Sequence, residues 1–266
     1  MFDAAAPSQQ RVHGRASVRL DGGRLRDLHQ SGSAKVLMPR VFGRAPEVVF
    51  LNTAGGITGG DRLDYALCVE KGACLATTQT AERAYRAIGA PGIVETRLRV
   101  GPGACLHWVP QELILFECAA LQRRLDVDMA EDAELVLLET LVLGRAAMGE
   151  VLHDIRLHDL RQVTRGGRLA MVEAIALGPE DLAGDNAAGL NGTMAIASLT
   201  LMACDAEDRL DALRAVLPDD VRAAASAWDG RLTARFSAPH AYPLRRAVAR
   251  AVEPVTRGAL PRVWQI

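Results

Sequence analysis

The sequence predicts a mainly β protein with a few α-helices. Through the first two thirds of the chain, short runs rich in β-branched, aliphatic and aromatic residues recur about every 10–15 residues, with turn-forming residues between them. Apolar residues at helical spacing are confined to two segments near the C-terminus. The segments show no strand–helix–strand alternation, which argues against a Rossmann-type sheet. These patterns are typical of three β architectures, the sandwich, the barrel and the solenoid, and do not distinguish among them.

The expected strands follow one another with turn chemistry between them. Asp21-Gly22-Gly23 predicts a hairpin turn, because glycine reaches positive φ freely. Lys71-Gly72 predicts a second hairpin, across which Cys68 and Cys74 would face each other. The predicted strands cover residues 15–20, 24–30, 47–52, 63–70, 74–80, 93–100, 105–111, 123–129, 134–143, 150–165, 168–177, 193–203 and 231–238.

Helices are expected at 206–217 and 242–252, where leucines and valines recur at helical spacing. Residues 82–87 are expected to form one short turn. The segment 178–192, GPEDLAGDNAAGLNG, is rich in turn-forming residues and poor in large apolar ones, so we expect a mobile surface loop there. We predict a single domain over residues 1–266.

Composition limits the partners. The formal net charge is −1, so no basic excess indicates a nucleic acid or an anionic membrane as partner. No apolar run is long enough to span a bilayer, and the first residues show no signal-peptide pattern, so we expect a cytoplasmic protein. The five cysteines include no C-x-x-C pair, and disulfides are not expected in a reducing compartment.

The stretch 51–63, LNTAGGITGGDRL, concentrates four glycines within six residues. A Walker A loop would need Lys-Ser or Lys-Thr after its last glycine, whereas Asp61 and Arg62 follow here, and an aspartate repels phosphate. A dinucleotide fingerprint would open a helix, whereas the following residues alternate like a strand. The glycines are therefore expected to permit unusual dihedral angles and close backbone packing.

Five motifs in one order resemble those of a known family. The glycine stretch is similar to N-P-x-G-G-x-x-G-G-D-x-L, although Thr53-Ala54 stands where many members carry Pro-Pro or Pro-Gly. The chain resembles the urease accessory protein UreD family, called UreH in some organisms, over nearly its whole length. The other matching motifs are Thr77-Thr78-Gln79 through Tyr85-Arg86, Leu106-His107-Trp108-Val109-Pro110-Gln111-Glu112, Leu143-Gly144-Arg145 with Gly149-Glu150, and Pro261-Arg262-Val263-Trp264.

The resemblance implies a fold and a role. It implies a helix-like stack of β-sheets with a few α-helices, and a protein that is not an enzyme. Members of the family bind the urease apoprotein and, with UreF and the GTPase UreG, which acts through UreF, help to insert nickel. The resemblance further implies an internal tunnel that nickel occupies transiently, with no tightly bound cofactor.

Acidic residues inside apolar strands are candidates for lining such a tunnel. Glu139 interrupts ELVLLETLVLGR, which is apolar on both faces, and Glu173 interrupts RLAMVEAIAL. A buried carboxylate is costly unless it is paired or binds a cation, and Ni²⁺ accepts carboxylate ligands. In the family, the positions that match Glu139 and Glu173 are acidic and linked to the tunnel, and Asp61 matches the aspartate of the glycine motif. We predict that Asp61, Glu139 and Glu173 line a transient nickel path.

Each of these residues has a structural alternative. Glu139 and Glu173 would pair with arginines such as Arg145 or Arg168, and Asp61 would cap backbone amides of its own turn. Two other classes of function also remain open: a metal-dependent hydrolase that uses the same three carboxylates as ligands, and a nucleotide-binding module built on the glycine stretch.

The remaining candidates have mostly structural readings. His153 and His158 lie five apart, so on a strand they would point to opposite faces. His107 is expected to be packed or hydrogen-bonded and not a ligand. Trp264, after a proline that restricts φ, is expected to dock into the core, with contact to a partner as the alternative.

Overall fold

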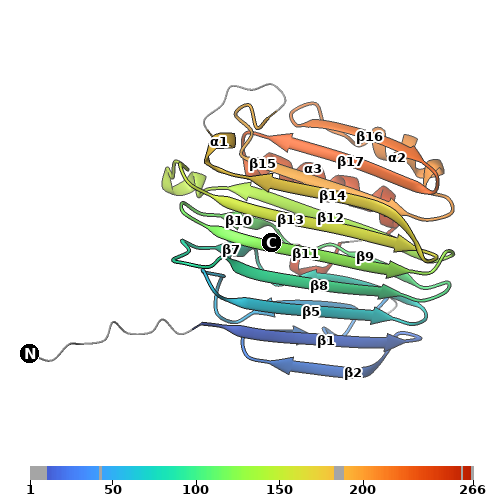
Figure 1. Ribbon diagram of the computed structural model, residues 1–266. Coiled ribbons are helices and arrows are strands. Elements are labelled where there is room, and N and C mark those ends of the chain that lie inside the picture. Colours follow the sequence, from blue (N-terminus) through green and yellow to red (C-terminus); the bar gives the residue numbers. More distant parts are fainter. Residues whose placement is uncertain (1–10, 42–43, 183–188, 259, 265–266) are drawn as a thin grey trace, which may run out of the picture.

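A computed structural model describes residues 11–41, 44–182, 189–258 and 260–264, and shows a mainly β protein, as the sequence predicts (Figure 1). Its strands form two mixed sheets, which we call sheet A and sheet B. Sheet A contains, in spatial order, β14 (Arg168–Leu177), β13 (Arg156–Arg165), β11 (Ala120–Met129), β8 (Gly92–Val100), β5 (Arg62–Val69), β1 (His13–Asp21) and β2 (Arg24–Ser31). Sheet B contains β16 (Arg222–Trp228), β17 (Arg231–Ala238), β15 (Ala195–Met202), β12 (Glu134–Leu143), β9 (Cys105–Trp108), β6 (Ala73–Thr78), β4 (Glu47–Asn52) and β3 (Ala34–Leu37), while β10 (Leu113–Leu115) pairs with β12 and with β7 (Glu82–Ala84).

The chain coils through the two sheets in alternation. It passes from β5 in sheet A to β6 in sheet B, from β8 to β9, and from β11 to β12. Successive strands within each sheet are therefore parallel at its centre, as in the pairs β5–β8 and β9–β12. Antiparallel strands close the ends, including the predicted hairpin of β1 with β2. This path agrees with the helix-like stack of sheets that the family resemblance implies.

The hairpin predicted at Lys71-Gly72 is wrong. β5 pairs with β1 and β8, whereas β6 pairs with β4 and β9, so Cys68 and Cys74 lie in different sheets. Turn-forming residues predict that the chain changes direction. They do not predict which strand will pair with the next one, because that depends on which strands bury their apolar faces together. All five cysteines are free.

Several other segments differ from the sequence-based expectations, including the strand predicted at 150–165, which begins only at Arg156. Residues 82–84 form strand β7 and not a helical turn, and β16 precedes β17 where no strand was predicted. The helix expected at 206–217 is shorter, with the 3₁₀ turn η2 (Glu207–Arg209) leading into α2 (Leu210–Arg214). Within 178–192, α1 (Pro179–Leu182) is helical; residues 183–188, to which the mobile-loop prediction also applies, lie outside the described residues.

The core has two apolar layers. The inner faces of sheets A and B enclose the first, and α3 (Ala241–Thr256) covers the outer face of sheet B to form the second (Figure 1). The helix predicted at 242–252 is thus confirmed and extends further at its C-terminal end. Leu244, Val248 and Val252 recur on one face and are buried against sheet B. Two short 3₁₀ turns, η1 (Ala146–Met148) and η3 (Arg262–Trp264), complete the elements.

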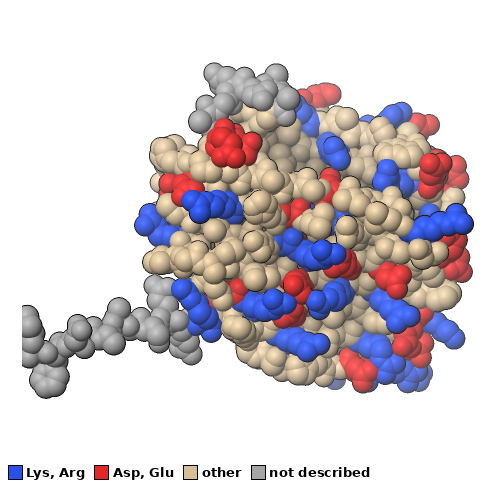
Figure 2. Space-filling model, viewed as in Figure 1, with Lys and Arg blue, Asp and Glu red and all other residues tan. Residues whose placement is uncertain are grey.

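The outer face of sheet A mixes basic and acidic side chains (Figure 2). Glu95 on β8 pairs with both Arg62 and Arg97. On the neighbouring strand β11, Arg124 pairs with Asp126. Exposed pairs contribute about 0–1 kcal/mol each, so the stability of the fold depends on its interior. Among the described elements, no helix has the length and apolar character that a membrane crossing requires.

Candidate functional site between the two sheets

Glu139 is a buried carboxylate on the inner face of sheet B. Its neighbours on the same face of β12, Leu137 and Leu141, belong to the apolar layer between the sheets. The indole Nε1 of Trp108 donates a hydrogen bond to Glu139 Oε1 at 3.3 Å, and Arg123 Nη2 donates to Oε2 at 2.6 Å. The side chain of Glu139 is only 5% exposed, so the ion pair with Arg123 offsets a large desolvation cost.

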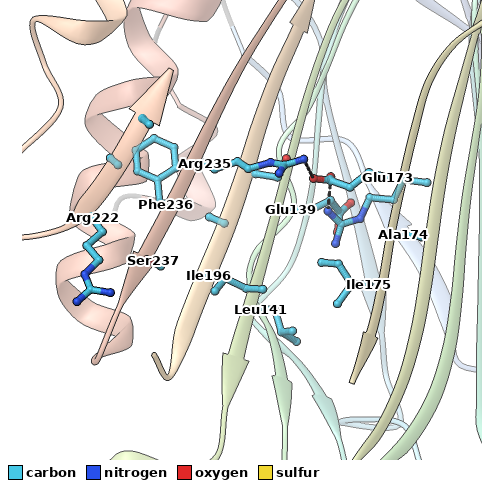
Figure 3. A pocket seen from close by; sticks show the side chains of 15 residues that line it. Glu139, Leu141, Glu173, Ala174, Ile175, Ile196, Arg222, Arg235, Phe236 and Ser237 are labelled. Atoms are coloured by element: carbon cyan, nitrogen blue, oxygen red, sulfur yellow. Dashed lines mark hydrogen bonds and ion pairs between the residues drawn. The ribbon is translucent and has the colours of Figure 1, made fainter. Parts of the chain in front are cut away.

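From Glu139, ion pairs continue across the interior to the surface. Arg123 Nη1 and Arg161 Nη2 both donate to Asp159 Oδ2, at 3.0 and 2.6 Å. Arg161 Nη1 donates to Glu173 Oε2 at 3.0 Å, and Arg235 reaches across from β17 to Glu173 Oε1 at 3.3 Å (Figure 3). Arg235 is exposed, so the chain of ion pairs joins a buried carboxylate to solvent. We call this set the ionic chain; its members are Glu139, Arg123, Asp159, Arg161, Glu173 and Arg235.

Strand register explains why these side chains meet. Asp159 and Arg161 are two residues apart on β13, so both point inward. In the parallel pair β11–β13, Arg123 is aligned with Asp159, and in the hairpin β13–β14, Arg161 is aligned with Glu173. Burial raises the pKa of Asp159, but Arg123 and Arg161 outweigh that effect and hold its pKa below the usual value.

A pocket of about 510 Å³ lies along the outer half of the ionic chain. Its walls include Glu139, Arg161, Glu173 and Arg235, together with apolar residues such as Ile175 (Figure 3). The two predicted carboxylates Glu139 and Glu173 therefore face one cavity between the sheets. Carboxylate oxygens at such a cavity are able to act as ligands of a divalent cation.

Glu82 on β7 is a further interior carboxylate. Asn52 Nδ2 donates to its Oε1 at 3.4 Å. Burial raises the pKa of Glu82 to about 7, and the charge of Arg123 only partly opposes that shift. Its charge therefore changes near neutral pH, unlike that of an ordinary glutamate.

Replacing Glu82 with Gln should raise the melting temperature at pH 8 and leave it nearly unchanged near pH 4.5. A carboxyl whose folded pKa is raised contributes stability that is complete below its unfolded pKa and is lost as pH rises through the folded value of about 7. Gln keeps the acceptor for Asn52 but does not ionise. Thermal unfolding of both proteins from pH 4.5 to 8 checks this; parallel curves for the two proteins would show that Glu82 is not destabilised by charging.

Asp61 occupies a different environment. Its Oδ1 accepts the backbone N–H of Val12 at 2.8 Å and its Oδ2 accepts that of Thr58 at 2.9 Å. Asp61 thus caps its own turn and fastens β1 beside it, the structural role anticipated for it. It is not among the residues that line the pocket with Glu139 and Glu173, and its metal role stays a prediction.

The glycines around Asp61 allow the close packing that the sequence predicts. A Cβ on Gly56 would lie 2.7 Å from the carbonyl oxygen of Arg83, and one on Gly59 would lie 2.6 Å from that of Ala90. Gly60 has φ +81°, which side chains rarely adopt. The stretch packs against β7 and the residues after it, and so positions Asp61.

The arginine partners of Glu139 and Glu173 differ from those suggested by sequence. Pairing with arginine is found, but Arg145 pairs instead with Glu150. Asp159 was not singled out either. A usable signal existed, since each of these residues stands two places along its strand from an apolar residue or from another member of the set, and so shares the face of the buried residues: Arg123 lies between Leu121 and Leu125, and Asp159 and Arg161 lie between Leu157 and Val163.

Two of the motifs form one contact at the C-terminus. Trp264 is buried, and its Nε1 donates to the carbonyl oxygen of Val109 at 3.0 Å. Gln111 Nε2 donates to the carbonyl oxygen of Val263 at 3.0 Å, and the guanidinium of Arg245 stacks on the Trp264 ring while also pairing with Glu112. Docking of Trp264 is confirmed, and Glu112 is a structural anchor.

Comparison with known proteins identifies the family. The family model described as UreD urease accessory protein matches residues 10–265. The chain is similar to proteins named urease accessory protein UreD from Jannaschia sp. (strain CCS1), at 77% identity over 100% of both chains, and from Cereibacter sphaeroides (strain ATCC 17025 / ATH 2.4.3), at 51% identity over 96% of both. A protein of the same name from Paracoccus denitrificans (strain Pd 1222) is 48% identical over 100% of this chain and 97% of its own. These relatives are named as accessory proteins and not as enzymes. The chain therefore belongs to the UreD family of urease accessory proteins.

Proposed function

We propose that this protein carries nickel toward the urease apoprotein, and that the nickel moves along the ionic chain between the two sheets. UreF would bind it on one side and urease on the other, with the GTPase UreG acting through UreF. The family assignment supports a role in urease maturation, and the single observation that carries the nickel path is the run of carboxylates from buried Glu139 to Glu173 at the pocket. The cytoplasm is the expected compartment, since all five cysteines are free.

Pairing with arginine suits transfer better than storage. Glu139, Asp159 and Glu173 each accept hydrogen bonds from at least one guanidinium, so a divalent cation must compete with an existing ion pair at every step. Such competition weakens binding at each carboxylate, and weak successive sites let an ion move on. Oxygen ligands alone also bind Ni²⁺ less tightly than a closed set of imidazole and thiolate would.

Glu173→Gln tests the proposal. We expect urease activation to fall by about 10-fold or more, by analogy with the loss of groups around other metal sites, while UreF and urease are still co-purified. Gln keeps the size of the side chain and its acceptor for Arg161 but removes the charge. The measurements are urease activity and nickel content after coexpression, together with pull-down of the complex.

Glu95→Gln is the matched control. Glu95 also pairs with two arginines, Arg62 and Arg97, but lies on the outer face of sheet A, away from the pocket. It should leave activation unchanged. If the two variants lowered activation equally, or if Glu173→Gln lost the complex in step with activation, the nickel path would be wrong.

A further inference from the structure

Cys105, His107 and Glu134 bring three metal-binding atoms together on the outer face of sheet B. Cys105 Sγ lies 3.2 Å from His107 Nε2 and 3.7 Å from Glu134 Oε1, and His107 Nε2 lies 3.1 Å from the same Oε1. Within the described ranges, this is the one group of at least three His, Cys, Asp or Glu residues whose ligand atoms all approach within 4.8 Å of one another.

Strand geometry produces this convergence. Cys105 and His107 are two residues apart on β9 and so point to the same face, and Glu134 on β12 is aligned with Cys105 in a parallel pair. That face is opposite to the one that carries the ionic chain, since Leu106 and Trp108, which alternate with them, belong to the layer between the sheets. The cluster is therefore independent of the proposed nickel path.

Arg209 orients the carboxylate of Glu134. Its Nη2 donates to Glu134 Oε2 at 2.6 Å, while its Nη1 donates to the carbonyl oxygen of Val255 in α3 at 2.5 Å and lies 3.4 Å from Glu134 Oε1. Asp205 accepts a further bond from Arg209. With Oε2 held in this way, Oε1 is directed toward Cys105 and His107. Partners behind a ligand that fix its orientation are typical of metal sites.

The geometry does not fit a Cys-His-Glu catalytic triad. In such a triad one ring nitrogen faces the thiol and the other faces the carboxylate. Here the same atom, Nε2 of His107, is nearest to both Cys105 Sγ and Glu134 Oε1. Three potential ligand atoms that converge on one point, instead of forming a line, match the arrangement of ligands around a single metal ion.

We propose that Cys105, His107 and Glu134 bind a divalent transition-metal ion of the borderline class, such as Zn²⁺ or Ni²⁺, with the remaining coordination position left to water. Thiolate and imidazole select ions of this class over Mg²⁺ or Ca²⁺. The usual Zn–S, Zn–N and Zn–O lengths place neighbouring ligand atoms of a tetrahedral site roughly 3.3–3.6 Å apart, close to the separations present here. His107 and Glu134 are partly exposed, at 15% and 25% of their side chains, so an ion from solvent can reach them.

Cobalt(II) substitution on the purified full-length chain tests the site. Co²⁺ should produce a thiolate-to-cobalt charge-transfer band and intense visible bands of tetrahedral cobalt, and an excess of Zn²⁺ or Ni²⁺ should displace it. Cys105→Ser should abolish the charge-transfer band, and His107→Asn should weaken Co²⁺ binding by about 10-fold or more. Cys68→Ser is the matched control, since Cys68 is also partly buried but lies on β5 in sheet A.

A second measurement needs no variant. Zn²⁺ should slow alkylation of Cys105, followed by peptide mass spectrometry, and leave the rate at exposed Cys204 unchanged. The site is overturned if wild-type protein gives no charge-transfer band, if Cys105→Ser keeps it, or if Zn²⁺ does not protect Cys105. None of these readouts depends on urease activation, so failure of this site and failure of the nickel path are distinguishable.

Discussion

Replacing Arg123 with Met is expected to lower the free energy of unfolding by about 3–5 kcal/mol at pH 7. Arg123 pairs with Glu139 and Asp159, whose side chains are only 5% and 2% exposed. Without the guanidinium, the hydrogen bonds that remain to these carboxylates from the described residues are those from Trp108 to Glu139 and from Arg161 to Asp159. Urea unfolding measures the difference. Arg124→Met on the same strand is the control, because Arg124 pairs with Asp126 on the exposed outer face and should change stability by about 1 kcal/mol or less.

The pH dependence of the Arg123→Met effect gives a sharper test. In the wild-type protein the pKa of Asp159 is depressed, so its ion pairs contribute stability that is present above the unfolded pKa and is lost as pH falls through the folded value. Removing Arg123 takes away much of this contribution, and the deficit should shrink as pH falls below about 4 and the carboxyl groups are protonated. Adding Glu139→Gln to Arg123→Met should recover part of the loss. Equal effects of Arg123→Met and Arg124→Met, or a deficit independent of pH, would contradict this account.

Replacing Trp264 with Ala is expected to cost about 3–5 kcal/mol, the range for removing a large buried aromatic side chain. The residue is 6% exposed, and its loss leaves the Val109 carbonyl without its indole donor and Arg245 without its stacking partner. Because Trp264 closes the contact that ties residues 261–264 to α3 and to Gln111, the variant should also make this segment more sensitive to proteolysis. Thermal and urea unfolding measure the first effect, and timed proteolysis the second.

Trp228→Ala serves as the control for Trp264→Ala. Trp228 is 44% exposed on the edge strand β16, where its ring stacks with Arg231. An exposed stacking contact of this kind is worth about 1 kcal/mol or less. If the two tryptophan variants were equally stable, the docking of Trp264 would add nothing to the fold. The partner contact considered for that residue would then explain the motif better.

Sequence patterns predicted most strands of the protein and few of their pairings. Residues 134–143 and 168–177 were expected as strands and match β12 and β14 to the residue. The partner strands were not predictable, because period-two alternation specifies which side chains are buried and says nothing about which sheet buries them. The turn at Lys71-Gly72 therefore looked like a hairpin, although it carries the chain from one sheet to the other.

The candidate site was predicted in part. Glu139 and Glu173 stood out because each is a carboxylate inside an apolar run, and the structure places both at one pocket. Arg123, Asp159 and Arg161 were missed, although each shares the face of the apolar residues on its strand. That shared face indicates burial, but only the placement of the strands shows which guanidinium meets which carboxylate. Cys105 was not singled out, and His107 was expected to be packed or hydrogen-bonded and not a ligand, although their spacing of two residues already put both on one face of a strand.

Composition and local pattern were enough to establish a mainly β protein with a C-terminal amphipathic helix, and the motifs were enough to indicate its family. Both can be read from short segments of the sequence, the first from the periodicity within each segment and the second from the motifs themselves. The coil through two sheets, the ionic chain and the cluster of Cys105, His107 and Glu134 depend on contacts between residues far apart in sequence. Those contacts form only when parallel strands align Arg123 with Asp159 and Cys105 with Glu134. Register between distant strands is set by the packing of the whole core, so it emerges with the tertiary structure and not before it.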